Sequence, residues 1–305
     1  MNKTITLTPM MQQYMETKKQ YSDCILFYRL GDFYEMFFDD AITASKELEI
    51  TLTGKNCGLE ERAPMCGVPY HSVDSYLNRL VEKGYKVAIC EQVEDPQQAK
   101  GIVKREVVRV VTAGTNMNAQ ALDETKYNYI MCIVYIADRY GLAVADVSTG
   151  DYFVTELDSG RKLLDEIHKF SPSEIICNES FYMSGLDLDD LRHRLGMMIY
   201  SIDTHFFDDV CARILKEHFH AASLEGMGLG DYNCGVIAAG ALLKYLYETQ
   251  KTSLSHITHI TGYATGRYML LDSSSRRNLE LCETLREKQK RGSLLWVLDK
   301  TKTAM

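Results

Sequence analysis

Hydrophobic runs and amphipathic stretches alternate along the first 112 residues. The run at 24–30, CILFYRL, is rich in aromatic and β-branched side chains and predicts a strand, which Gly31 and Asp32 end as a turn signal. Thr8 before Pro9 is typical of a helix start, with a hydroxyl cap and a proline in the first turn. The same criteria predict helices over 9–21, 39–49 and 71–83, strands over 24–30, 33–38, 50–53, 85–92 and 104–112, and a polar loop over 54–63.

A second pattern begins after residues 113–128, which have no apolar period and predict a linker. Three strand-like runs come first, and helices then alternate with further strands. That order predicts a mixed-sheet α/β domain over 129–252. Its main predicted elements are strands over 130–137, 141–148, 151–157, 174–177 and 197–202 and helices over 161–170 and 234–249.

The last segment, residues 253–305, predicts a strand over 268–272 and a helical stretch over 273–285. The chain then reaches Met305 within an amphipathic stretch that has no cap and no stop signal. We therefore expect the chain to be part of a longer protein.

Composition fits a globular protein of about two domains, with 46% hydrophobic and 25% charged residues among 305. No stretch of about 18 uncharged apolar residues predicts a transmembrane helix, and the first residues lack a signal-peptide pattern. The nine cysteines form no CxxC pair and no zinc-site spacing, so we expect free thiols in a reduced, cytoplasmic protein. Cys57 and Cys66 flank one loop and could approach each other.

The net charge of −8 does not by itself suggest a nucleic-acid partner. Its distribution is uneven: residues 1–112 carry −2, residues 113–252 carry −10 and residues 253–305 carry +4. The acidic middle segment is therefore the part least suited to lie along phosphates, whereas the first and last segments could present local basic faces.

Six sequence blocks identify a resemblance to a known family. They are TPMMQQY, LFYRLGDFYEMF, PMCGVPYHSVDSYLNRLVEKGYKVAICEQVEDP, KGIVKREVVRVVTAGT, ADVSTGDY and LLDSSSRRNLEL. In this order they resemble the MutS family of bacterial DNA mismatch repair proteins over essentially the whole chain. The resemblance implies a mismatch-recognition domain over 1–112, a linker over 113–128, an RNase H-like connector domain over 129–252 and the truncated start of an all-α core domain over 253–305.

The family's Phe-x-Glu motif falls on Phe33, Tyr34 and Glu35. The resemblance implies that Phe33 enters the minor groove, stacks on a mispaired base and kinks the duplex. Strand alternation places Phe33 and Glu35 on one face. Unstacking a base step costs a few kcal/mol, and a mispaired or unpaired base lowers that cost, so we expect recognition of deformability rather than of a base code. The alternative is that Phe33 fills the core and Glu35 is merely solvated.

A carboxylate near phosphates needs an explanation. Glu35 could hydrogen-bond a base as the neutral acid, because nearby negative charge and desolvation both favour the protonated form. Other side chains could contact DNA, the basic ones as positional phosphate contacts without sequence information. Solvated surface charge or loop packing is the alternative for each of these: Arg29, Leu30, Lys55, Tyr70, His71, Arg105 and Arg109.

Two sequence features bear on enzyme activity. Asp146, Asp151, Asp165 and Glu166 in an RNase H-like domain would suit a two-metal nuclease. The resemblance argues against this, and Asp146 before Ser148 more simply ends a strand and starts a hairpin. No GxxxxGK[ST] motif occurs, since Glu49 stands where the first glycine before Gly54-Lys55 should be, so we expect no ATP site in this chain.

The resemblance also implies properties of the full-length protein. It would bind ATP and Mg²⁺, form a homodimer, and contact a MutL-type repair partner through the connector domain, in the cytoplasm and associated with the nucleoid. Its ligand would be double-stranded DNA with mismatches or small loops, with no metal in this chain and no membrane. A MutS relative that acts on recombination intermediates is a further alternative, and the intact Phe33-x-Glu35 motif argues against it.

Overall fold

The computed structural model describes residues 7–94, 101–117, 127–193, 196–265, 271, 273–287 and 289–301. The chain separates into two compact units. The first unit comprises residues 1–121 with 247–253, and the second comprises residues 122–246 with 254–305. Each unit contains a six-stranded mixed sheet with helices, so the predicted α/β class is confirmed.

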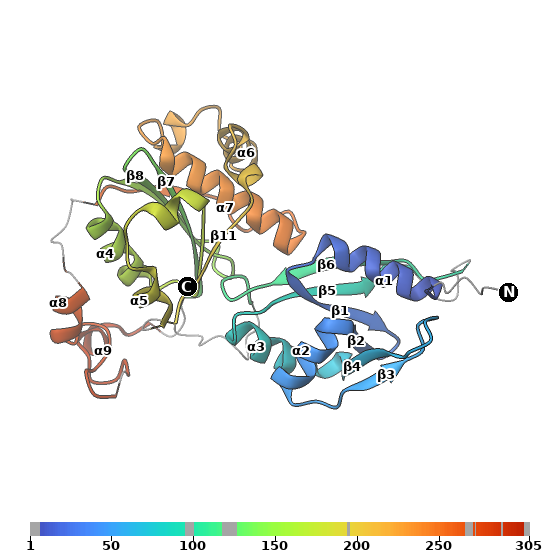
Figure 1. Cartoon of the computed structure of the whole chain (residues 1–305). Helices are drawn as coiled ribbons and strands as arrows, with labels where there is room; N and C mark the ends of the chain where they lie inside the picture. The colour runs from blue at the N-terminus through green and yellow to red at the C-terminus, as the bar shows by residue number, and fades with distance from the viewer. Residues whose placement is uncertain are drawn as a thin grey trace. The chain divides into compact units, whose positions relative to one another are not determined.

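The sheet of the first unit has the strand order β3-β4-β2-β1-β5-β6. β1 and β5 are parallel, and the other neighbours are antiparallel. Helix α1 (Pro9–Gln20) covers one face of this sheet, and α2 (Phe38–Leu48) and α3 (Val73–Glu82) cover the other (Figure 1). The strands are β1 (Cys24–Leu30), β2 (Phe33–Phe37), β3 (Thr53–Lys55), β4 (Ala63–Pro69), β5 (Lys86–Gln92) and β6 (Arg105–Val111).

Side-chain alternation along β1 divides the core of the first unit into two layers. Phe27 packs with Met36 in the layer under α2 and α3, whereas Leu26 and Tyr28 pack with Phe37 in the layer under α1. Because both faces of the strand are covered, the strand carries an unbroken hydrophobic run instead of a polar alternation. Each residue of β1 and β2 therefore faces either the layer under α1 or the layer under α2 and α3.

Three local predictions in the first unit were wrong. The strand predicted over 50–53 is β3 at Thr53–Lys55, and β4 was not predicted because Pro64 and Gly67 are typical of loops. Pairing with β2 on one side and β3 on the other overrides that local preference. Helix α1 begins at Pro9 as predicted, but the buried Thr8 hydroxyl has no hydrogen-bond partner among the described residues.

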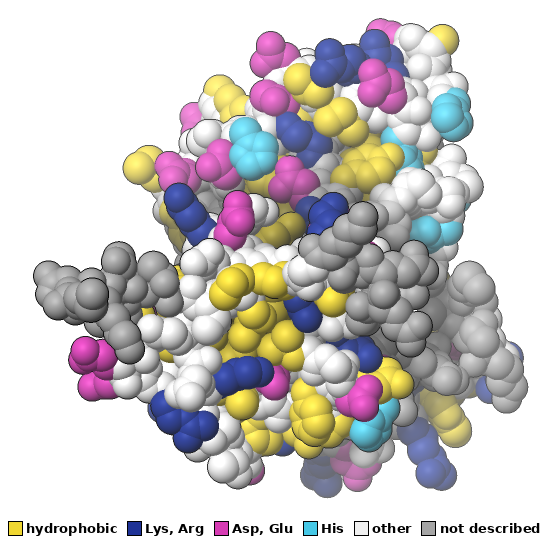
Figure 2. Space-filling model, turned by 90° about the vertical axis from the view of Figure 1, so that its right-hand side faces the viewer, with side chains coloured by type: hydrophobic (Ala, Val, Ile, Leu, Met, Phe, Trp, Pro, Cys, Tyr) yellow, Lys and Arg dark blue, Asp and Glu magenta, His cyan; other side chains and the backbone are white. Residues whose placement is uncertain are grey.

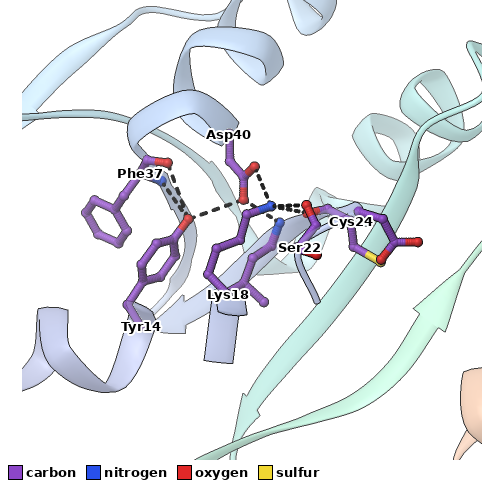
Figure 3. Close-up of polar contacts among 8 residues, drawn as sticks. Tyr14, Lys18, Ser22, Cys24, Phe37 and Asp40 are labelled. Atoms are coloured by element: carbon purple, nitrogen blue, oxygen red, sulfur yellow. Dashed lines mark hydrogen bonds and ion pairs between the residues drawn. The ribbon is translucent and has the colours of Figure 1, made fainter. Parts of the chain in front are cut away.

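A buried carboxylate joins three elements of the first unit (Figure 3). Asp40, near the start of α2, accepts a hydrogen bond from the Leu26 amide at 3.0 Å and one from the Tyr14 hydroxyl at 3.3 Å. Its other oxygen lies 2.9 Å from the Lys18 ammonium of α1. The Tyr14 hydroxyl also donates to the Phe37 carbonyl at 3.3 Å. Asp40 therefore fixes α1 against β1 and against the end of β2.

The sheet of the second unit has the order β11-β10-β7-β8-β9-β12, with β7, β8 and β9 antiparallel and the remaining pairs parallel. Helices α4 and α5 pack on one face, and α6 and α7 lie on the other (Figure 1). The strands are β7 (Tyr129–Ile136), β8 (Arg139–Asp146), β9 (Tyr152–Leu157), β10 (Glu174–Cys177), β11 (Met198–Ser201) and β12 (Thr261–Gly262). The helices are α4 (Gly160–Phe170), α5 (Leu188–His193), α6 (Val210–His218) and α7 (Cys234–Gln250).

The last segment differs from the predicted helical region. Thr261–Gly262 forms β12, which pairs in parallel with β9 at the edge of the second sheet. The predicted strand over 268–272 lies outside the described residues, apart from residue 271. Within the predicted helical stretch over 273–285, only α8 (Ser273–Asn278) is helical, and α9 (Leu294–Leu298) follows it.

The cysteines are free thiols, eight of them buried and Cys282 exposed. Cys57 packs in the layer under α1 and Cys66 in the layer under α2 and α3, so the sheet separates the two. Burial raises the pKa of Cys66 and of Cys90 to about 12, which keeps these thiols protonated and unreactive. Across the described residues, no helix has both the length and the apolar character needed to cross a membrane.

Candidate nucleic-acid interface

The β1–β2 hairpin places Phe33 on the surface. Gly31 has a φ of +58°, a conformation that glycine adopts without a steric penalty, and this residue and Asp32 form the two-residue turn between Leu30 and Phe33. The Tyr70 amide donates to the Asp32 carbonyl at 3.0 Å and ties the turn to the end of β4. Phe33 is 46% exposed, whereas the next residue, Tyr34, is buried. Phe33 is therefore not part of the core.

Glu35 lies on the same face as Phe33 and is not free in solvent. Its carboxylate is 2.5 Å from the Lys55 ammonium, and only 17% of the Glu35 side chain is exposed. The interpretation of Glu35 as a solvated surface residue is therefore wrong for this structure. Glu35 and Lys55, each a separate candidate for DNA contact, form one ion pair.

Two further candidates share this face of the sheet. Leu30 is paired with Phe33 and is partly buried against the layer under α1. Arg105 of β6 points to the same layer, and its guanidinium donates to the Arg29 carbonyl at 2.8 Å, the Val103 carbonyl at 2.9 Å and the Gln13 side chain at 3.2 Å. Arg105 is therefore held by protein acceptors and fixes the end of β1.

The other basic candidates lie away from Phe33. Arg29 alternates with Leu30 and packs its guanidinium on the Tyr70 ring, 3.9 Å from the ring centre. Arg109 alternates with Val110 and shares its face with Val111, in the layer under α2 and α3. His71 is exposed in the short 3-10 helix Tyr70–Ser72. The sheet therefore separates Arg29 and Arg109 from the face that carries Phe33 and Glu35.

Exposed hydrophobic surface occurs at this end of the first unit, where Phe33 and Tyr70 are both nearly half exposed. Figure 2 shows a face of the molecule on which hydrophobic side chains gather with Lys and Arg side chains beside them. The exposed Tyr70 ring carries the Arg29 guanidinium 3.9 Å from its centre, and exposed rings with a cation nearby suit a ligand that offers flat bases and phosphates.

Two contributors to this region had not been identified from the sequence. Tyr34 donates a hydrogen bond to Glu91 of β5, and burial, followed by that hydrogen bond, raises the pKa of the Tyr34 phenol. Gly67 faces Glu35 across the β2–β4 ladder. The position of Tyr34 inside the motif was a signal for its contact with Glu91. The pairing of Gly67 with Glu35 depends on a strand register that the sequence did not predict.

Asp146, one of the carboxylates considered for a nuclease, has a structural role. Asp146 is fully buried, and one of its oxygens accepts from the amides of Ser148 and Thr149, while the other accepts from the Asn128 amide at 2.8 Å. Asp146 ends β8 and shapes the turn before β9, as the hairpin interpretation predicted. Among the side chains that the structure describes, no group of three or more His, Cys, Asp or Glu residues could hold a metal ion.

Comparison with known proteins assigns both halves of the chain to one family. The family model described as MutS domain I matches residues 8–120, and the model described as MutS domain II matches residues 128–258. The chain belongs to the MutS family. The two matched domains of MutS thus contain the first sheet, with Phe33 and Glu35, and most of the second sheet.

Curated MutS relatives agree with this assignment. The chain is 67% identical over 300 residues to the DNA mismatch repair protein MutS of Lachnoclostridium phytofermentans, 57% identical over 304 residues to that of Ruminiclostridium cellulolyticum and 54% identical over 304 residues to that of Acetivibrio thermocellus. Each alignment covers 98% of this chain and 32%, 34% and 35% of the relative, respectively. The chain therefore spans about a third of the length of the relatives it matches.

Proposed function

We propose that this chain recognises mispaired or unpaired bases in duplex DNA at the start of DNA mismatch repair. The observation that carries the proposal is the half-exposed ring of Phe33 at the tip of the β1–β2 hairpin, on the same face as Glu35, within the part that matches MutS domain I. Curated relatives that share more than half of its residues are named DNA mismatch repair proteins.

The geometry supports an aromatic wedge. A ring that leaves a core for solvent loses favourable burial unless a ligand covers it, and a base offers a flat surface for stacking. The wedge opens a base step at a cost of a few kcal/mol, and a mispaired step costs less to open. Phe33 therefore favours mismatched over paired duplex without reading a base sequence. Glu35 would add a hydrogen bond to a base next to the opened step.

The second unit has a connecting role in this proposal. It would couple mismatch recognition in the first unit to ATP-binding domains in the rest of the protein, and it would offer a surface to a MutL-type partner. The full-length protein would be a homodimeric ATPase that uses Mg²⁺. These roles involve parts of the full-length protein that lie outside this chain, which spans about a third of the length of its relatives.

Glu35→Gln in a full-length MutS protein with this sequence is expected to bind paired duplex more tightly and to discriminate less. The glutamine amide can donate a hydrogen bond in the place where the neutral acid would, but the substitution removes the carboxylate whose repulsion from phosphates penalises unkinked DNA. We expect roughly a 2- to 5-fold gain on paired duplex, the size of a partly exposed charge interaction.

Competition between paired and mismatched duplex across pH 6 to 9 measures this effect. If Glu35 donates to the base as the neutral acid, wild-type mismatch affinity weakens as pH rises, whereas the glutamine variant shows a flat profile. Equal discrimination by the two proteins at every pH would remove Glu35 from the proposal.

The chain on its own is expected to bind DNA only weakly, at about micromolar affinity or worse, and to show no ATP turnover. Phosphate contacts dominate DNA affinity, and most of them would come from parts of the family beyond this third. Fluorescence anisotropy with a mismatched duplex at physiological salt and a phosphate-release assay measure the two quantities. Nanomolar binding or ATP turnover by the pure chain would contradict the expectation.

A further inference from the structure

The Lys55 side chain reaches Glu35 across an intervening strand. Lys55 is on β3 and Glu35 is on β2, and β4 lies between them in the sheet. Lys55 is paired with Ala63, whereas Glu35 is paired with Gly67 further along β4. The ion pair therefore runs diagonally over β4 on the face that carries Phe33.

Gly67 keeps the space beside Glu35 open. A Cβ atom at Gly67 would lie 3.5 Å from the Glu35 Cγ atom and 3.2 Å from the Tyr34 carbonyl oxygen. The second distance is tighter than ordinary van der Waals contact, so any larger residue would displace β2 or the Glu35 side chain. The β2–β4 ladder thus gives the carboxylate one defined place beside the wedge.

The surroundings of the ion pair strengthen it. The exposed fractions of the Lys55 and Glu35 side chains are 33% and 17%. The Lys55 ammonium also lies 5.6 Å from the centre of the Phe37 ring, within the range of a cation–π interaction. A pair that is partly withdrawn from water interacts more strongly than a fully solvated one. The pair engages one carboxylate oxygen of Glu35, so turning that carboxyl group toward a base would weaken or break its contact with Lys55.

We propose that Lys55 is a specificity-determining residue that acts through Glu35. The inference rests on the proposed function. On paired duplex, Lys55 stays on Glu35 and offsets the repulsion between the carboxylate and the phosphates. On mismatched duplex, Glu35 turns to the opened base step and leaves Lys55, so the broken ion pair is part of the free energy of mismatch binding. Lys55 therefore determines how much Glu35 contributes to the difference in affinity between mismatched and paired duplex.

A double-mutant cycle tests this role in a full-length MutS protein with this sequence. Lys55→Met keeps the length of the side chain and removes its charge. With Glu35 intact, it is expected to weaken paired-duplex binding by roughly 2- to 5-fold, because the carboxylate is no longer neutralised. In the Glu35→Gln background, the same substitution is expected to change paired-duplex binding little. Lys55→Arg keeps the charge and should restore wild-type binding.

The alternative is that Lys55 contacts a phosphate directly. In that case Lys55→Met would weaken paired and mismatched binding by the same factor in both backgrounds, and this additive result would overturn the inference. Lys83→Met is the matched control, because Lys83 pairs with Glu47 at 2.8 Å on the side of the sheet covered by α2 and α3. It should leave both affinities unchanged, and an effect as large as that of Lys55→Met would also overturn the inference.

Failure of the inference can be told apart from failure of the proposed function. If Phe33→Ala and Glu35→Gln leave mismatch discrimination unchanged, mismatch recognition by this face is wrong, whatever the cycle gives. If those two variants lose discrimination but the Lys55 and Glu35 effects are additive, the proposed function stands and the role of Lys55 is wrong. If Phe33→Ala and Glu35→Gln lose discrimination and the Lys55 and Glu35 effects are coupled, the results support both the proposed function and the role of Lys55.

Discussion

Phe33→Ala is expected to lower the affinity of a full-length MutS protein with this sequence for mismatched duplex by about 5- to 150-fold, the range of one lost aromatic–base stack. Affinity for paired duplex is expected to change by less than about twofold, since phosphate contacts dominate it. The reason lies in the position of the ring. It is nearly half exposed at the hairpin tip, so its removal takes away a surface for stacking while leaving the core intact.

Direct competition between the two duplexes measures this ratio, and two variants separate the possible causes. Phe33→Leu keeps hydrophobic bulk without a flat ring and should recover only part of the discrimination. Ile42→Ala removes an exposed hydrophobic side chain of similar exposure from α2, on the side of the sheet away from Phe33, and should leave both affinities unchanged. Equal losses of paired and mismatched binding in Phe33→Ala would show that the ring supports general DNA contact and is not a wedge.

Asp40→Ala is expected to lower the free energy of unfolding of the first unit by about 3 kcal/mol. The substitution leaves the Leu26 amide without its acceptor inside the core and removes the counter-charge of Lys18. The Lys18 side chain is 23% exposed and can turn toward water, which places the loss at the lower end of the cost of breaking a buried pair. The core layer under α1, which contains Phe37, should also become less stable.

Hydrogen exchange of β1 and α1 amides in increasing urea measures this loss within the first unit. Tryptophan fluorescence would miss it, because the single tryptophan, Trp296, belongs to the second unit. Asp39→Ala is the matched control, since Asp39 is the preceding carboxylate in the same helical turn and is exposed. We expect it to change stability by less than about 0.5 kcal/mol. Similar losses in the two variants would mean that helix-end charge, and not the buried network, is responsible.

The sequence alone determined most of the elements and the common face of Phe33 and Glu35 at the hairpin tip. β1 was predicted with its observed bounds because a run of aromatic and β-branched residues before Gly31-Asp32 has one favourable local structure. Alternation from Phe33 to Glu35 follows from strand geometry alone, so their common face needed no tertiary information. The three strands at the start of the second sheet were likewise predicted from their strand-like runs, whereas their antiparallel pairing is seen only in the structure.

Only the tertiary structure decided which partners these residues have. β4 contains proline and glycine and forms a strand because β2 and β3 supply its hydrogen bonds, so its register, and with it the place of Gly67 beside Glu35, could not be predicted locally. Lys55 and Glu35 are 20 residues apart in the sequence, and the fold brings their charges together across β4. Asp40 lies at the start of the helix predicted over 39–49, and packing of α1 buries it on Lys18 and Tyr14. Local sequence determines which secondary structure each segment prefers. Strand pairing and burial depend on contacts between residues that are far apart in the chain, and no local pattern encodes those contacts.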